Sequence, residues 1–337
     1  MINQKRNIML KPQINISYSS SARMWLVFSC AFLCIIQSAL TDNGLSLIIA
    51  LTSLFTALFV ELLLTWKKSG FSKILDGSAA ATAMTFSLLL PNQIHPVYAA
   101  IGSVFAIIVV KYSFGGLGSN WLNPALGGWL FIRFSWHEAF EKALNTPPLA
   151  SNASIYTGTI DNSVTSFLNN SVFSLTGVQL PSGYIYLLFS NEPGIIADRG
   201  IFMLLIGTLF ITVFGISRNF IPVVFIAVYA FFIRLAGDAS GELWNGDILF
   251  GLFSGGTIAC AFIIAAEPSS GAKLVPGVLL SVFIGAFLSW VFRYQCLEYT
   301  GCFIALAAVN CCTPLIRLLE DKLFLSHRNK AATEGGL

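Results

Sequence analysis

The sequence predicts an all-α polytopic membrane protein with about ten transmembrane helices in two inverted five-helix repeats and a long extracytoplasmic loop. Of its 337 residues, 55% are hydrophobic and only 10% are charged, whereas about a quarter of the residues of a soluble domain are charged. The apolar residues form long uninterrupted blocks, which suit lipid as the solvent. Two of these blocks resemble each other, and this similarity predicts the repeat.

Ten apolar blocks have roughly the length needed to cross a bilayer. They lie near residues 24–41, 45–66, 77–91, 97–112, 120–134, 200–216, 219–236, 248–267, 275–293 and 299–317. A polar stretch, residues 135–198, separates the first five blocks from the last five. The predicted parts are an N-terminal segment (1–23), a first repeat (24–134), the loop (135–198), a second repeat (199–318) and a tail (319–337).

The distribution of Lys and Arg predicts the orientation, because cytoplasmic segments carry an excess of both residues. If the N-terminus is cytoplasmic, the inner segments hold fourteen of the 19 basic residues. Both termini are therefore expected in the cytoplasm and residues 135–198 outside. The net charge of +3 is small and gives no indication of nucleic-acid binding.

The two similar blocks run from Asp76 to Pro91 and from Phe253 to Pro268. Each opens with small residues, continues apolar and stops at a proline. They are the third and eighth blocks, and an offset of five reverses the direction through the membrane, which predicts inverted repeats. Short or glycine-interrupted helices of this kind can end within the membrane and leave helix ends to face a ligand. Close helix packing through small residues is the alternative interpretation.

A third irregular segment lies between the fourth and fifth blocks and contains Gly115, Gly116, Asn120, Asn123 and Pro124. Glycines let a backbone approach a ligand, and Asn side chains offer both donors and acceptors. We interpret this segment as ligand-facing, in preference to an ordinary tight turn.

These stretches resemble the family that includes RnfD of the Rnf complex and NqrB of the Na⁺-translocating NADH-quinone reductase (Nqr). The resemblance is carried by L-D-G-S-A (75–79), K-Y-S-F-G-G-L-G-S-N-W-L-N-P-A-L (111–126), L-P-S-G-Y…N-E-P-G-I-I-A-D (180–198), F-S-G-G-T…A-E-P (253–268) and A-A-V-N-C-C-T-P-L (307–315). It implies a subunit of a multi-subunit, ion-pumping electron-transfer complex of the bacterial cytoplasmic (inner) membrane, not catalytic alone. Such complexes couple redox chemistry to Na⁺ or H⁺ transport, and the family has ten helices in two inverted halves.

The resemblance also implies an FMN esterified through its phosphate to a threonine of the outer loop, attached by a flavin transferase. The family's acceptor motif, D-x-x-[ST]-G-A-T, is absent from residues 135–198. Thr165, which follows Asp161, is the expected acceptor because the family's acceptor lies well upstream of the stretch matching Leu180. Thr159 is the second choice. The Thr-Gly of residues 176–177 is disfavoured because Gln179, which has no hydroxyl group, occupies the acceptor position.

Carboxylates near the ends of the blocks are candidates for an ion path, because ionisable groups at membrane depth are costly and tend to be functional. We expect Asp76 and Glu267 in that role, although Asp76 is also placed to cap the following helix. Glu61 is interpreted as reaching the surface beside Lys67 and Lys68. Arg199 is interpreted as an anchor of the sixth block at the membrane interface, in preference to a partner for the phosphate.

No nucleotide-binding motif or metal-binding pattern of Cys or His is present. Because the flavin-attachment motif is not fully kept, two alternatives to the flavin-carrying subunit stay open. One is a channel or transporter for a small polar solute, since inverted repeats with interrupted helices also build transporter sites. The other is a scaffold subunit of the same kind of complex without its flavin.

Overall fold

The computed structural model describes residues 19–66, 74–113, 115–116, 120–146, 188, 194–214, 218–236, 244, 246–267 and 271–334. Within these residues the secondary structure is almost entirely helical, and the β-type pairing consists of one isolated bridge between Pro91 and Ile195. Each of the ten apolar blocks contains helix. The predicted all-α class is therefore confirmed.

The first half consists of α1 (Ser20–Thr41), α2 (Leu45–Thr65), α3 (Ser78–Leu89), α4 (Pro96–Phe105), the π-helix η2 (Ala106–Tyr112), α5 (Pro124–Ser135) and α6 (His137–Asn145). Local signals explain several starts. The Ser19 side chain accepts a hydrogen bond from Ala22 N at the start of α1. Pro96 and Pro124 open α4 and α5, where the missing N–H has no helical partner to lose.

The second half consists of the short α9 (Ile196–Arg199), α10 (Ile201–Val213), α11 (Phe220–Ala236), α12 (Ile248–Phe253), α13 (Thr257–Ala259), the π-helix η4 (Cys260–Ile264), α14 (Val275–Trp290), the π-helix η5 (Val291–Gln295) and α15 (Gly301–Glu334). The eighth apolar block is thus divided between α12, α13 and η4. Gly255 and Gly256 make that break possible, because both have positive φ angles, of 68° and 70°.

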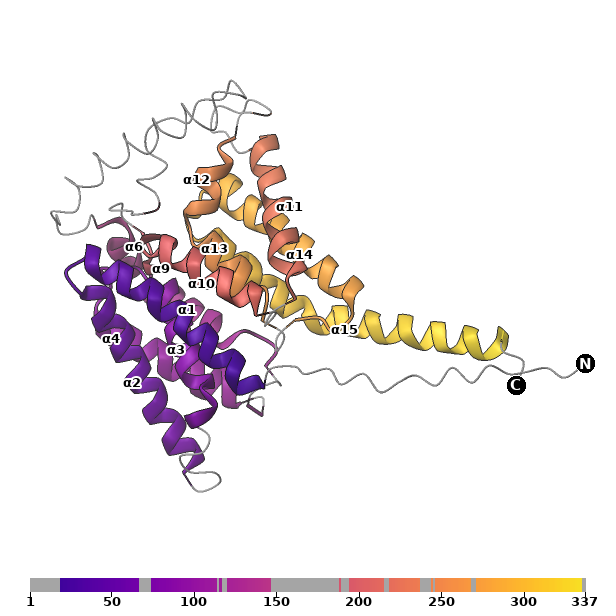
Figure 1. Ribbon diagram of the computed structural model, residues 1–337, viewed down its shortest axis with the longest axis horizontal. Helices are drawn as coiled ribbons and strands as arrows, with labels where there is room; N and C mark the ends of the chain where they lie inside the picture. The colour runs from indigo at the N-terminus through magenta and orange to yellow at the C-terminus, as the bar shows by residue number, and fades with distance from the viewer. Residues whose placement is uncertain are drawn as a thin grey trace, which may run out of the picture.

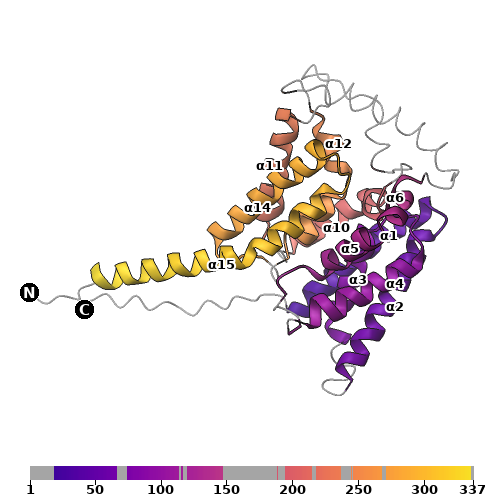
Figure 2. The same ribbon diagram turned by 180° about the vertical axis from the view of Figure 1, so that it is seen from behind.

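The two halves lie side by side, with α1–α5 on one side, α11–α15 on the other and α10 between them (Figures 1 and 2). α15 continues beyond the bundle as a projecting helix (Figure 1). The main seam is the packing of α1 on α10, where a Cβ on Gly200 or Gly207 would lie only 2.3 Å from the sulfur of Cys34 or Cys30. Small residues at this seam let the two helix backbones approach closely.

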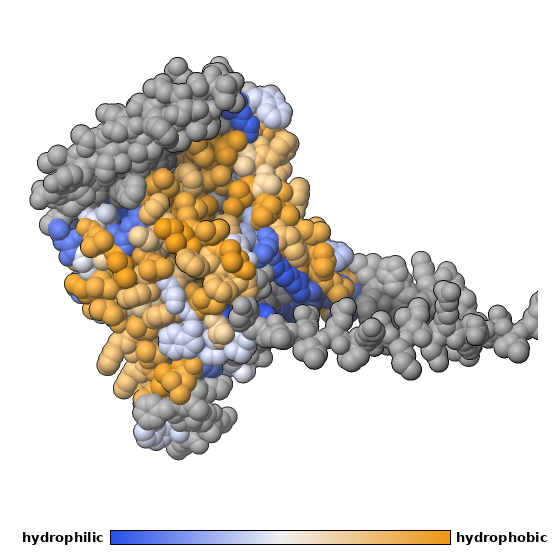
Figure 3. All heavy atoms as spheres, in the orientation of Figure 1, coloured by the Kyte–Doolittle hydropathy of each residue, from blue (hydrophilic) through white to orange (hydrophobic). Residues whose placement is uncertain are grey.

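In the part of the chain that the structure describes, four helices are long and apolar enough to cross a membrane: Ser20–Thr41, Leu45–Thr65, Val275–Gln295 and Gly301–Lys322. Their outer surfaces are apolar, and Phe55 and Leu63 of α2 are 74% and 63% exposed. Figure 3 shows hydrophobic residues over most of the visible surface of the bundle. A soluble protein does not expose apolar surface on this scale. The chain is a multi-pass membrane protein.

Candidate functional site

A buried polar cluster joins α2, α3 and η2 at the end of the bundle where α1 begins. Lys111 Nζ lies 2.7 Å from Glu61 Oε1 and donates a second hydrogen bond of 2.7 Å to Ser78 Oγ. Tyr112 OH donates to the same Glu61 oxygen at 2.9 Å. The side chains of Lys111 and Glu61 are 3% and 1% exposed. We call these four residues the Lys111 cluster.

The backbone explains how the Lys111 cluster forms. Gly77, with a φ angle of 74°, turns the chain into α3. Ser78 N then donates to Asp76 Oδ1 at 2.8 Å, so the sequence-predicted capping role of Asp76 is confirmed. Lys111 lies within the π-helix η2, whose wider turn changes the direction of side chains relative to an α-helix. Helices of this kind often occur at functional sites.

The charges of the Lys111 cluster are expensive in this position. Removing a carboxylate and an ammonium from water costs several kcal/mol per ion, and their attraction offsets this only with good geometry. Within the described residues, Glu61 Oε2 is buried and has no hydrogen-bond partner. A buried acceptor without a protein partner calls for a specific explanation, and a bound water or ion is one of them.

A second buried cluster lies at the opposite end of the bundle. Arg293 of η5 donates to Ser254 O at 2.6 Å and to Ser254 Oγ at 2.5 Å. Asp198 of α9 accepts from the backbone N–H groups of Gly255 and Gly256, at 3.0 and 2.7 Å, and from Tyr299 OH at 2.8 Å. We call these residues the Arg293 cluster.

The two clusters have corresponding construction. In each, a cation in the π-helix that ends an apolar block contacts a serine at, or three positions before, the start of a short buried helix. That start follows a glycine with positive φ, Gly77 before α3 and Gly256 before α13. The two blocks whose similarity predicted a repeat are therefore the two elements that the cations contact.

Contacts between the halves involve the far ends of the same two blocks. Asn123 Nδ2 donates to Glu267 Oε2, while Asn123 Oδ1 accepts from Ala125 N at 2.8 Å and caps α5. At the other end, Ile196 N donates to Leu90 O at 3.0 Å. Each short helix thus starts in its own half and ends against the other half.

A comparison with protein-family models identifies the chain. The model described as the NQR2, RnfD, RnfE family matches residues 7–324. The chain belongs to this family. The match covers nearly the whole chain and confirms the resemblance found in the sequence motifs.

Curated members of the NQR2, RnfD, RnfE family resemble the chain over most of their length. The subunit designated D in the proton-translocating ferredoxin:NAD(+) oxidoreductase complex of Clostridium ljungdahlii is 25% identical over 93% of this chain and 94% of its own. Its counterpart in the Na(+)-translocating ferredoxin:NAD(+) oxidoreductase complex of Acetobacterium woodii is 27% identical over 74% and 73%. The counterpart in the ion-translocating oxidoreductase complex of Erwinia tasmaniensis is 30% identical over 75% and 78%. Two of these names specify different ions.

Several predicted site residues lie between η2 and the first residue of α5. Gly115 and Gly116 have positive φ angles of 102° and 93°, and Gly116 faces open space. Asn120 is buried, and its Oδ1 has no hydrogen-bond partner within the described residues. Asn123 and Pro124 serve the start of α5. Of the two asparagines, Asn120 therefore retains an acceptor that the fold does not use.

An apolar groove of about 350 Å³ lies beside this segment, between α4, η2 and α5. Its lining includes the stacked rings of Phe105 and Phe131, 4.1 Å apart, and Trp121. The predicted flavin acceptors Thr165 and Thr159 lie outside the described residues. The chain continues from α6 into residues 147–193, and α6 follows the end of α5 opposite Trp121; α5 is about 18 Å long.

The sequence did not predict that most of these charged residues are buried. Glu61 does not reach the surface beside Lys67 and Lys68, because it is fully buried against Lys111. Arg199, interpreted as an interface anchor, is also fully buried. Lys111, which was counted among the basic residues of the inner segments, is buried as well. A lone charge that ends an apolar block was the available signal for Lys111 and for Arg293.

Proposed function

We propose that the chain is the membrane subunit in which an ion-translocating electron-transport complex couples redox chemistry to Na⁺ or H⁺ movement. Its relatives are named as subunits of such complexes. The observation that carries the proposal is the buried Glu61–Lys111 pair at the start of a short helix, with one carboxylate oxygen unpartnered. Ionisable groups buried in membrane helices are costly and tend to mark ion pathways.

The proposed topology has ten spans in two inverted repeats, with both termini on the cytoplasmic side of the bacterial inner membrane. The Lys111 and Arg293 clusters, related in construction and located at opposite ends of the bundle, support this arrangement. The excess of Lys and Arg puts the Lys111 cluster at the cytoplasmic end. Asp76 and Glu267 lie at the same end and are partly exposed, so a cation from the cytoplasm meets them before it reaches the buried Glu61.

The proposed electron carrier is FMN, linked to Thr165 or Thr159 by a flavin transferase; once bound, it supplies electron transfer in one- or two-electron steps. The described residues offer one feature that fits a planar ring. The apolar groove lined by Phe105, Phe131 and Trp121 runs along α5 to Phe134 and Ser135 at the outer end of this helix, and its cytoplasmic end adjoins the Asn120 segment. Gly115, Gly116, Asn123 and Pro124 shape that segment.

Ion transport in membrane vesicles tests the role of the Lys111 cluster. We expect the double variant Glu61→Gln/Lys111→Met, in the assembled complex, to lose most of the ion uptake that electron transfer drives. The double substitution removes both charges together and so avoids leaving one of them buried alone. Glu320→Gln is the matched control, because Glu320 is also buried and its two carboxylate oxygens accept from the backbone amides of Lys273 and Leu274. Uptake at the wild-type rate in the double variant contradicts the proposed role.

A further inference from the structure

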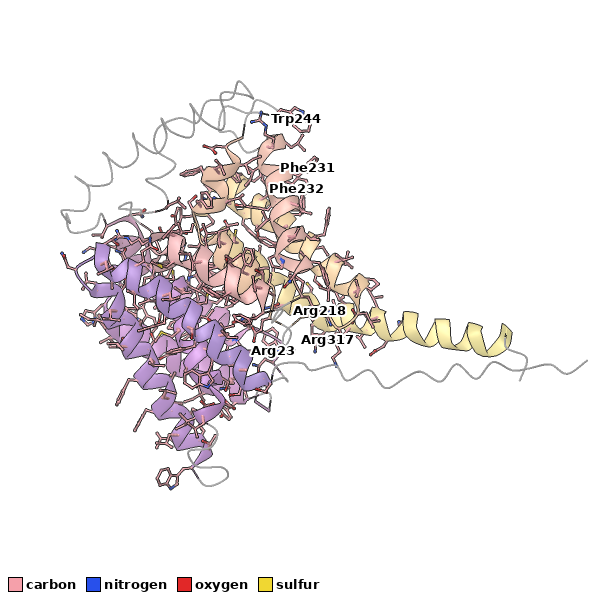
Figure 4. All side chains as sticks on the ribbon, in the orientation of Figure 1. Arg23, Arg218, Phe231, Phe232, Trp244 and Arg317 are labelled. Atoms are coloured by element: carbon pink, nitrogen blue, oxygen red, sulfur yellow. The ribbon has the colours of Figure 1, made fainter. Side chains whose placement is uncertain are left out.

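A cationic crease lies between the two halves at the end of the bundle where α1 begins. It is formed by Arg23 of α1, Arg218 before α11, Arg317 of α15 and the exposed Lys273 before α14. Figure 4 shows Arg23, Arg218 and Arg317 near one another at this end of the bundle. Figure 3 shows a hydrophilic strip there between two apolar surfaces. Four elements from both halves thus contribute positive charge to one place.

Two of the arginines are fixed against the same short segment. Arg218 Nη2 donates to Lys273 O at 3.1 Å, and Arg317 donates to Gly271 O from Nε and Nη2 at 3.2 and 2.7 Å. The nearby Glu320 carboxylate accepts from the N–H groups of Lys273 and Leu274 with its two oxygens. Both carboxylate oxygens of Glu320 are therefore hydrogen-bonded to the backbone of that segment.

The packing of α1 on α10 brings Arg23 to the same end. Gly200 lies against Cys34 and Gly207 lies against Cys30, so the two helices run antiparallel. Following α10 toward its C-terminal end, and on to Arg218, therefore leads toward the first turn of α1. Arg23 is half-buried there, and its Nε has no acceptor among the described residues.

Arginine groups of this kind match the oxygens of phosphate esters. A guanidinium has five N–H donors and pairs bidentately with phosphate, whereas the bond to Lys273 O uses only one donor of Arg218. Basic pockets between transmembrane helices on the cytoplasmic side bind anionic lipid headgroups. Apolar side chains beside the crease are available to acyl chains, since Val213 and Leu318 are 73% and 59% exposed.

We propose that this crease binds one anionic phospholipid with two phosphate groups, of the cardiolipin type, which joins the two halves of the molecule. Basic residues that only set the orientation of the chain in the membrane need not gather at one place. Here residues from both halves converge, and two phosphates are needed to neutralise several cations at once. The bound lipid stabilises the seam between α1 and α10 in addition to their direct packing.

Lipid binding to the purified, delipidated full-length chain in detergent tests the proposal. The probe is cardiolipin added at defined ratios, followed by native mass spectrometry and by the thermal unfolding midpoint. We expect one cardiolipin per chain and a rise of the midpoint that saturates near that ratio. Losing charge-assisted bonds in Arg23→Gln or Arg218→Gln is expected to weaken binding roughly tenfold or more.

Arg234→Gln is the matched control. Arg234 is exposed and donates to the backbone oxygen of Gly246, much as Arg218 does to Lys273, but it lies at the end of α11 on the other side of the membrane. This variant is expected to bind cardiolipin like the wild type. Equal weakening in all three variants overturns the site. Equal binding of phosphatidylethanolamine, or equal stabilisation by inorganic phosphate, overturns the anionic lipid as the ligand.

Discussion

At the scale of single residues, the Lys111 cluster is arranged to keep an ion pair dry but not fully satisfied. Lys111 has two acceptors within 2.7 Å, whereas Glu61 uses one oxygen for both of its donors and leaves the other without a partner. An arrangement selected only for stability would use both oxygens, since an unsatisfied buried acceptor costs about 1–3 kcal/mol. The imbalance favours a role in binding a mobile cation.

Covalent flavin attachment is also decided at the scale of one residue. We expect co-expression with a flavin transferase to make the denatured wild-type chain fluoresce in a gel, because the ester bond survives denaturation. Thr165→Ala should abolish the fluorescence, since only a hydroxyl group can form the phosphoester, while the matched variant Thr159→Ala keeps it. The reverse result moves the attachment to Thr159. A dark wild-type band favours the solute channel or the flavin-free scaffold.

The sequence identified the motifs around these residues but not their partners. Asp76 was expected to cap α3, and it does, because capping depends on residues two or three positions apart. Glu61 and Lys111 are 50 positions apart. A periodicity argument cannot pair such residues, because their contact exists only after α2 and η2 have packed together.

At the scale of elements, the three π-helices of the described residues were not predicted. They follow α4 (η2), the three-residue α13 (η4) and α14 (η5). Hydrophobic blocks identify helix but do not distinguish its turn width. The tertiary contacts of Lys111 and Arg293 account for two of the three, since each cation extends from its π-helix to the start of a neighbouring helix.

The α1–α10 seam gives a prediction at this scale. Gly207→Ala places a Cβ only 2.3 Å from the Cys30 sulfur. Overpacking of this kind costs roughly 1–3 kcal/mol, so the unfolding midpoint of the solubilised chain should fall. Adding Cys30→Ala removes the nearest atom and should restore part of the loss. Gly271→Ala, whose Cβ would meet its nearest neighbour at 3.5 Å, serves as the control. No change in Gly207→Ala contradicts the close packing.

At the scale of the whole molecule, the proposed inverted topology predicts which side of the membrane each turn occupies. Cys296, exposed in the turn before α15, should lie outside. In a variant that keeps Cys296 as its single cysteine, intact cells should react with a membrane-impermeant maleimide. A cysteine introduced by Asp321→Cys into a chain without other cysteines should react only after the membrane is opened. Labelling of both positions in intact cells contradicts the topology.

The sequence by itself determined the membrane class, the positions of the ten apolar helical blocks, the similarity of residues 76–91 to 253–268, and the family. These properties depend on composition and short-range pattern, which lipid and backbone hydrogen bonding convert directly into helices. The tertiary structure decided where the charges lie. It buried Glu61 and Arg199 against the interpretation that placed them at the surface, and it joined Lys111 to Ser78 and Arg293 to Ser254. The reason is physical: in lipid a charged side chain is stable only beside a partner, and that partner comes from a helix distant in the chain.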